Sequence, residues 1–196
     1  MHMRVSILIA VVALILILPA SAQMQTWNID ENHSAAQFSV RHLAISTVRG
    51  SFNKVSGSVQ YDPSNPAKTT IDATIDAASV DTRVEKRDND LRSPSFFDTA
   101  KYPTLTFKSK RVETAGSGKL KVTGDLTLHG VTKEVTLDVD GPSAAIKDPH
   151  GNLHMGASAT TTVNRKDFGV NGASAAVGDD VPIIIDLELV RPAPAP

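Results

Sequence analysis

The chain has 196 residues, with 20 lysines and arginines against 21 aspartates and glutamates, and it contains no cysteine. The lack of cysteine excludes a disulfide framework, a thiolate nucleophile and a cysteine-ligated zinc site. The nearly neutral charge provides no long-range field that would draw the whole chain to nucleic acid or to acidic lipid.

Residues 1–22 have the pattern of a secretory signal peptide. Arg4 supplies the positive charge, residues 5–18 form an apolar run, and Pro19 precedes an A-x-A signal that ends at Ala22. The run is shorter than the roughly 20 residues that span a bilayer as a helix. We therefore expect cleavage near Ala22 and a periplasmic or secreted protein.

We expect one domain over residues 23–190, followed by a disordered Pro/Ala tail over residues 191–196. Within the domain, eight runs alternate between apolar and polar residues with period two, which is typical of half-buried strands. These runs are residues 37–42, 50–61, 70–77, 104–108, 119–128, 134–140, 155–163 and 181–189. Turn signals separate them, so the pattern predicts an antiparallel all-β domain, either a sandwich or a barrel.

One segment after the third run lacks this alternation. Residues 82–92 carry two apolar residues seven positions apart, which indicates one face of a helix, and Asp81 or Thr82 can cap its start. A second short helical turn is expected from Ser93 to Phe97. The expected plan is three strands, a short helical crossover and five more strands.

The inward faces leave two alternatives open. Eight strands closed into a barrel have either a packed core or room for one small ligand. The apolar stripes mix large residues, such as Phe52 and Leu126, with small ones, such as Ala73 and Gly124. Small inward residues either create space or accommodate large neighbours, so the residues alone allow both a ligand cavity and a packed sandwich.

The sequence contains neither a G-x-S-x-G nor an H-E-x-x-H motif. Residues 116–119, Gly-Ser-Gly-Lys, resemble the end of a phosphate-binding loop, but Leu120 stands where Ser or Thr belongs, so we expect a hairpin turn. His150 and His154 have the spacing of a helical metal site, yet they lie in a turn sequence. We predict no catalysis, no metal site and no required cofactor.

Three residues are candidate polar contacts for a ligand. His42 shares an apolar face with Phe38, so its ring is either a hydrogen-bonded core histidine or a polar handle for a ligand. Arg87 in the expected helix and Arg165 in a turn are either solvated residues or groups that grip an anionic or carbonyl head group at the mouth of a barrel.

Landmarks along the chain together resemble the YceI-like family of exported proteins. The matching stretches are Trp27-Asn-Ile-Asp30, His33-Ser34, Phe38-Ser-Val-Arg-His-Leu43, Val48-Arg-Gly-Ser-Phe52, Gly57, Ser79-Val-Asp-Thr82, Arg87-Asp88, Leu91-Arg-Ser93, Phe96-Phe-Asp98, Tyr102-Pro103, Leu105-Thr-Phe-Lys-Ser109, Gly124 to Lys133, Arg165-Lys-Asp-Phe-Gly169 and Val177-Gly-Asp-Asp-Val181. The likeness covers nearly the whole domain in order. One departure is Asp90, at a position where the family usually has histidine.

The resemblance implies an eight-stranded, lipocalin-like antiparallel barrel with a long apolar cavity for a polyisoprenoid, an isoprenoid quinone or a fatty-acid derivative. It also implies a periplasmic or secreted location, often with a homodimer. The partner is then an apolar lipid, with transient membrane contact and no nucleic acid. The ligand-binding residues that we expect are Phe38, Val40, His42, Phe52, Arg87, Phe96, Leu105, Phe107, Leu126, Arg165, Ile183 and Ile185.

From these observations we infer a binding protein that carries or stores its ligand and catalyses nothing. The alternative is a periplasmic stress-response or interaction module with a packed core and no bound lipid. A third reading, an enzyme acting on a lipid head group, needs a convergent acid and base near the mouth, and no spacing in the sequence demands one.

Overall fold

A computed structural model describes residues 24–193. The predicted signal peptide and the last three residues of the predicted tail lie outside the described residues. Within the described part, no helix has both the length and the apolar character needed to cross a membrane.

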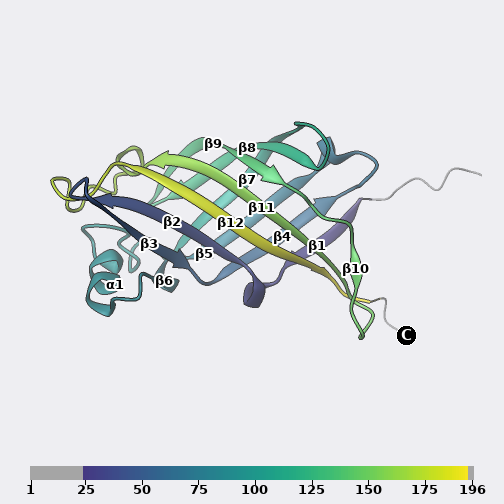
Figure 1. Cartoon of the computed structure of the whole chain (residues 1–196), viewed down its shortest axis with the longest axis horizontal. Helices are drawn as coiled ribbons and strands as arrows, with labels where there is room; N and C mark the ends of the chain where they lie inside the picture. The colour runs from purple at the N-terminus through teal and green to yellow at the C-terminus, as the bar shows by residue number, and fades with distance from the viewer. Residues whose placement is uncertain (1–23, 194–196) are drawn as a thin grey trace, which may run out of the picture.

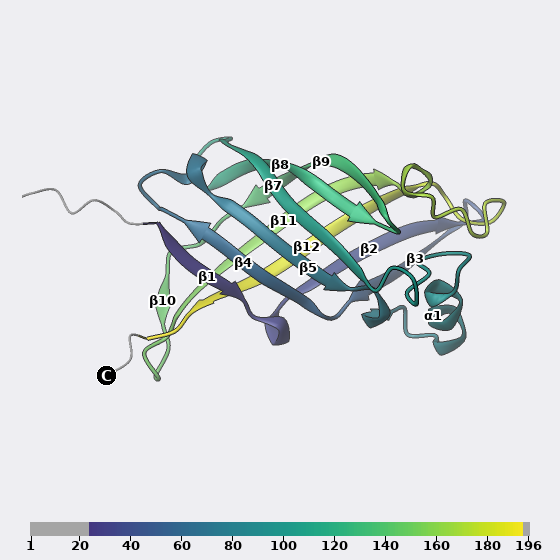
Figure 2. The same cartoon turned by 180° about the vertical axis from the view of Figure 1, so that it is seen from behind.

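Eight antiparallel strand lines close into a barrel (Figures 1 and 2). Three lines are each made of two successive strands: β1 (Gln25–Ile29) with β2 (Ala35–His42), β3 (Ser46–Phe52) with β4 (Val55–Tyr61), and β5 (Thr70–Asp76) with β6 (Val80–Asp81). The other lines are β7 (Thr104–Thr114), β8 (Lys119–Leu128), β9 (Val131–Asp140), β11 (Leu153–Asn164) and β12 (Asp180–Arg191). The ring closes because β12 pairs with β1 and β2 on one side and with β11 on the other. The predicted eight-stranded barrel is confirmed, and it decides against the sandwich.

Short elements lie at the two ends of this barrel. The helix α1 (Glu85–Arg92) follows β6, and the two-residue strand β10 (Ile146–Lys147) pairs with β11. Figure 1 shows α1 and the turn between β2 and β3 at one end, called the α1 end below, and β10 at the other, the β10 end. Four 3₁₀ turns complete the described elements: η1 (Glu31–His33), η2 (Pro66–Lys68), η3 (Ala77–Ser79) and η4 (Arg165–Phe168).

The helix begins later than the sequence predicts, and neither of the expected residues caps it. Thr82 donates its backbone N–H and its hydroxyl to Oδ1 of Asp88, at 2.8 and 2.5 Å. The side chain of Thr82 therefore bonds to a helix side chain and not to a backbone N–H at the start of the helix. Asp81 accepts from the backbone N–H of Arg83 at 2.7 Å. Residues 93–97 form hydrogen-bonded turns and not a second helix, with the N–H of Phe96 donating to the carbonyl of Ser93.

The end of the domain also differs slightly from the prediction. β12 continues to Arg191, one residue beyond the expected boundary. Ala193 then donates its backbone N–H to the side-chain oxygen of Asn152 at 3.2 Å. The first residues of the predicted tail are therefore held against the barrel.

The buried apolar side chains form three clusters. One cluster lies toward the α1 end, around Phe52, Val80 and Phe168. A second lies toward the β10 end, around Trp27 and Leu189. The third lies on the wall made by β7, β8 and β9. Partly buried residues such as Ile75 and Val135 pack against two clusters each, so the clusters meet along the barrel interior.

Candidate ligand tunnel

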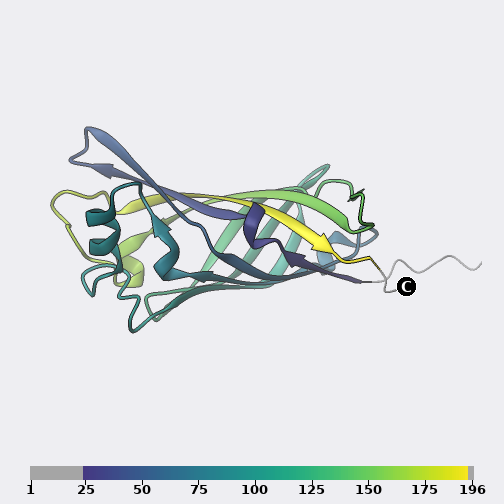
Figure 3. The same ribbon diagram turned by 90° about the horizontal axis from the view of Figure 1, so that it is seen from below.

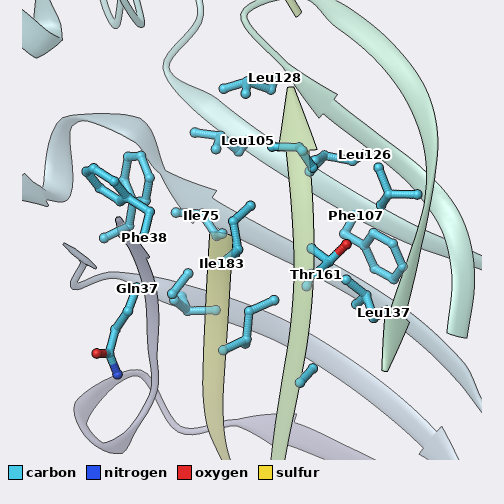
Figure 4. Close-up of a pocket in the computed structure, with 18 of the residues that line it drawn as sticks. Gln37, Phe38, Ile75, Leu105, Phe107, Leu126, Leu128, Leu137, Thr161 and Ile183 are labelled. Carbon is cyan, nitrogen blue, oxygen red and sulfur yellow. The ribbon is translucent and has the colours of Figure 1, made fainter. Parts of the chain in front are cut away.

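A cavity of about 220 Å³ lies inside the barrel, with walls from all eight strand lines. Phe96 and Val177 line it at the α1 end, and Thr69 and Pro142 line it toward the β10 end, so it extends along the barrel axis. Figure 4 shows part of the wall, where side chains from β5, β7, β8, β11 and β12 face a shared space. The cavity is called the tunnel below.

The dimensions of the tunnel restrict what fits inside it. Its volume is below the range of about 300–1,000 Å³ that is usual for pockets of drug-sized ligands. Because this small volume is spread along the barrel, the tunnel is narrow. It suits a thin, flexible chain better than a compact ring system, and a bulkier chain would require the side chains along it to move.

Aromatic rings line the tunnel at the α1 end. The centroids of Phe38 and Phe52 are 5.7 Å apart, and those of Phe52 and Phe97 are 5.3 Å apart. Phe38, Phe96 and Phe97 are only half-buried. These three rings therefore retain accessible apolar surface at this end of the tunnel.

Trp27 and Leu189 fill part of the interior near the β10 end, where a second pocket also adjoins the tunnel at Pro142, Ala157 and Leu187. Trp27 is 2% exposed and does not line the tunnel, while Leu189 beside it is 1% exposed. The guanidinium carbon of Arg191 lies 5.2 Å from the centroid of the Trp27 ring. Trp27 therefore closes part of the barrel interior near this end.

Glycines make room for two of the tunnel's aromatic rings. A Cβ added to Gly50 would lie 2.6 Å from Cζ of Phe38, and one added to Gly124 would lie 2.6 Å from Cζ of Phe107. Each ring thus occupies the space that a side chain at the glycine would take. A larger residue at either glycine would force the ring to move.

Most of the residues predicted to bind a ligand line the tunnel. They are Phe38, Val40, Phe52, Phe96, Leu105, Phe107, Leu126, Arg165, Ile183 and Ile185. Their contact with a ligand stays a prediction, but the structure brings them to one cavity. His42 and Arg87 are not part of its lining.

The two outlying residues have other contacts. His42 is half-buried at the end of β2, where its backbone forms an isolated bridge with Val177. Arg87 donates from Nε to the hydroxyl of Thr82 at 2.7 Å and from Nη2 to the Thr82 carbonyl at 2.8 Å. Arg87 therefore holds the loop before α1, and the structure does not place it at the tunnel.

Arg165 lines the tunnel, but its guanidinium is used within the protein. Nε donates to the carbonyl of Gly178, Nη1 to those of Val170 and Gly172, and Nη2 to the Val177 carbonyl and to Asp179, at 2.8–3.2 Å. A guanidinium has five N–H donors, so none is left for a ligand head group. Arg165 instead fixes the loop of residues 170–179 at the α1 end.

Thr161 is a tunnel residue that the sequence analysis did not select. It lies on β11 opposite Ile183, and Figure 4 shows its hydroxyl oxygen on the side of Phe107 and Leu137. This oxygen is a polar atom within an otherwise apolar section of the wall. The period-two pattern of β11 places Thr161 on the inward face, and this pattern is the sequence feature that could have identified it as a tunnel residue.

A second group of polar side chains lies on the outer face, toward the β10 end. Nδ1 of His154 lies 2.7 Å from Glu188 and its Nε2 lies 3.2 Å from Asp148, while Nδ1 of His33 lies 2.8 Å from Asp30. These five residues, called the polar clasp below, join η1, β11, β12 and the loop after β10.

Hydrogen bonds explain the electrostatics of the clasp. Glu188 and then Asp148 raise the pKa of His154, and Asp30 raises that of His33. Burial tends to raise the pKa of Asp148, but hydrogen bonds from Asn152, His154 and nearby backbone together lower it.

Within the described residues, Asp30, His33 and Glu188 bring ligand-type atoms within 4.8 Å of one another, which is a spacing that a small cation can use. The hydrogen bonds between imidazole and carboxylate account for the same arrangement without a metal.

An eight-stranded antiparallel barrel around an apolar tunnel defines the lipocalin-like class of barrels. The YceI-like domain matches residues 27–189, and the chain belongs to that family. A UPF0312 protein of Vibrio cholerae is 37% identical over 179 residues, covering 89% of this chain and 94% of the relative.

Two solved structures show the same fold. The Campylobacter jejuni YCEI protein is 33% identical with a TM-score of 0.68, covering 78% of this chain and 90% of that protein. A polyisoprenoid binding domain from Saccharophagus degradans is 19% identical with a TM-score of 0.64, covering 87% of this chain and all of that domain.

Proposed function

We propose that this protein is exported, loses residues 1–22, and holds one long apolar ligand in the tunnel as a carrier or store. The ligand is a polyisoprenoid, an isoprenoid quinone or a fatty-acid derivative. The protein performs no chemistry on it and requires no cofactor. The signal-peptide pattern supports the export, and the tunnel supports the binding.

The observation that carries the proposal is the apolar tunnel itself. It is continuous from Phe96 at the α1 end to Pro142 toward the β10 end, and its wall is built from Val, Leu, Ile, Phe and Ala with few polar residues. Each methylene group that leaves water for such a wall contributes about 0.8 kcal/mol. An apolar chain gains this transfer free energy along its whole length, whereas a compact polar ligand finds few hydrogen-bonding groups in the tunnel wall.

The same energetics favours a carrier or store over an irreversible trap. A lipid tail that leaves a membrane for the tunnel exchanges one apolar environment for another, so most of the gain relative to water cancels. Association and ordering costs reduce the remainder. The protein would then take up and release its ligand near thermal balance.

The ligand class agrees with the description of the S. degradans domain as polyisoprenoid binding. At 19% identity that likeness concerns the fold alone, so the ligand class proposed here rests on the tunnel. The alternative function, an interaction module with a packed core, is disfavoured by the internal cavity of about 220 Å³.

The test is mass spectrometry of a solvent extract from protein that has been exported and purified without detergent. We expect a stoichiometric isoprenoid or fatty lipid from the wild type. Ile183→Trp fills the tunnel and should lose that lipid, whereas the outward-facing neighbour on β12 provides the control, since Ile184→Trp should retain it.

Thermal unfolding of both variants shows whether Ile183→Trp still folds, since overpacking costs about 1–3 kcal/mol. A clean wild-type extract, repeated after incubation with membrane lipids, would contradict binding and favour the interaction module. Carriage is tested separately, by the exchange of labelled polyprenyl lipid between vesicles. Lipid content without exchange would leave the protein a store.

A further inference from the structure

The turn between β2 and β3 exposes apolar side chains at the open end of the barrel. Leu43 is 55% exposed and Ile45 is 80% exposed. Leu43, Ala44 and Ile45 are called the hairpin tip below. Figure 3 shows this hairpin at the same end of the barrel as α1. Water-exposed leucine and isoleucine at the end of a projecting hairpin gain nothing for the fold of the monomer.

The backbone of the hairpin tip is also unusual for these residues. Leu43 has φ 51° and Ala44 has φ 58°, in the left-handed region that asparagine and glycine prefer in hairpin turns. The turn is nevertheless well fixed. The N–H of Ile45 donates to the carbonyl of His42, and Arg41 donates from Nη1 to the Thr47 hydroxyl and from Nη2 to the Ala44 carbonyl. The apolar residues are therefore presented on a rigid support.

The hairpin tip is continuous with the tunnel. The N–H of Leu43 donates to the Ala176 carbonyl at 2.7 Å, and the N–H of Gly178 donates to the Arg41 carbonyl at 2.8 Å. Val177, between those two loop residues, lines the tunnel, as does Val40 of β2. A surface that covers the hairpin tip therefore lies next to the aromatic end of the tunnel.

The hairpin of β2 and β3 carries basic and no acidic side chains, and Asp179, which follows the adjoining loop, is paired with Arg165 and Lys166. The sequence from Asn32 to Tyr61 contains no aspartate or glutamate, and the loop of residues 168–178 contains no charged residue. Arg41 and Arg49 are exposed on the two strands that lead to the tip. The net charge of the whole chain is nearly neutral, but the side chains of this hairpin are basic. Basic side chains next to exposed apolar ones suit the phosphate head groups and the apolar interior of a bilayer.

We propose that the hairpin tip, flanked by Arg41 and Arg49, docks onto the surface of an anionic lipid bilayer and places the α1 end of the tunnel against it. This inference rests on the proposed function and names the membrane as the source and destination of the ligand. A second copy of the chain fits the surface less well. A two-fold contact through this small convex tip would bring the arginines of both copies together, and like charges across an interface are unfavourable.

The test is co-sedimentation with vesicles of phosphatidylcholine containing phosphatidylglycerol. The wild type should bind, and added salt should weaken binding because it screens the arginines. Leu43→Asp combined with Ile45→Asp should lower the bound fraction at least tenfold. Ile146→Asp is the matched control, because Ile146 is 68% exposed at the opposite end, and it should bind as the wild type does.

A second readout separates docking from ligand binding. Polyprenyl lipid delivered from cyclodextrin, without vesicles, should bind equally to the wild type and to the double variant. Wild type that takes up this lipid but ignores vesicles would overturn the docking proposal and leave the proposed function intact. Wild type that binds vesicles but no lipid would overturn the proposed function alone. A wild-type dimer in light scattering that the double variant abolishes would overturn docking in favour of self-association.

Discussion

The two ends of the barrel differ in how they are closed. At the β10 end, Trp27 and Leu189 are fully buried, and the hydrogen bonds of His154 in the polar clasp tie β11 to β12 and to the loop after β10. At the α1 end, Phe38 and Phe96 are half-buried beside the tunnel, and apolar residues of the hairpin tip face water. The α1 end leaves apolar surface of the tunnel wall and of the hairpin tip free, which suits passage of an apolar chain. At the β10 end, a second pocket adjoins the tunnel at Pro142, Ala157 and Leu187.

The largest effect should come from emptying the closed end. Trp27→Ala removes a ring that is 2% exposed and should lower the free energy of unfolding by about 3–5 kcal/mol, measured by denaturant unfolding. Trp27→Phe should cost less, because the indole nitrogen has no hydrogen-bond partner among the described residues. An equal cost for both substitutions would show that a phenyl ring cannot replace the indole, and a negligible cost for alanine would show that Trp27 does not stabilise this end.

At the open end, Gly50→Ala should push a ring into the tunnel. The new Cβ would lie 2.6 Å from Cζ of Phe38 and 2.8 Å from Cγ2 of Thr82. We expect a stability loss of about 1–3 kcal/mol and at least tenfold weaker lipid binding in a fluorescence titration. Phe38→Leu in the same chain should restore binding. Gly156→Ala is the control, since no atom lies within 4 Å of its added Cβ, and reduced binding there would contradict the steric cause.

A smaller effect should distinguish ligands within the tunnel. Thr161→Val keeps the shape of the wall and removes its hydroxyl. A chain that carries a carbonyl near this point, such as a quinone, should bind about 0.5–1.5 kcal/mol less tightly, whereas a plain polyprenyl hydrocarbon should be unaffected. Parallel titrations of the two ligands measure the difference. Equal losses would mean that Thr161 acts only through packing.

The smallest effect concerns pH at the clasp. The pKa of His154 is raised in the folded protein, mainly by Glu188 and then by Asp148, so the protonated ring stabilises the fold below its ordinary pKa of 6.5. This contribution is lost as pH rises through the elevated folded value. The melting temperature of the wild type should therefore fall on going from pH 6 to pH 8, and His154→Gln should reduce that fall. His150→Gln, at an exposed histidine in the turn that precedes β11, should behave as the wild type. An unchanged pH dependence of the melting temperature in His154→Gln would show that protonation of His154 in the polar clasp does not stabilise the fold.

The period-two runs and the turn signals between them predicted an antiparallel all-β domain, because both are local signals. The choice of a barrel over a sandwich came from the resemblance to the YceI-like family. The sequence analysis missed β1, since five residues around Trp27 are too short to stand out before the interruption at η1. It also placed Arg165 among the ligand contacts. The five hydrogen bonds of that guanidinium are to residues 5 to 14 positions further along the chain, in the loop of residues 170–179, whose path no period-two pattern predicts. His154 meets Glu188 only because β11 pairs with β12.

The most direct test of ligand binding in the tunnel is a crystal structure of the mature protein, exported and purified without detergent. We predict continuous, chain-like electron density along the tunnel, from the rings of Phe38 and Phe96 toward Ala157 and Leu187, with the more polar end of the ligand at the α1 end. A barrel whose side chains meet across the axis, with no density between them after incubation with lipid, would contradict it.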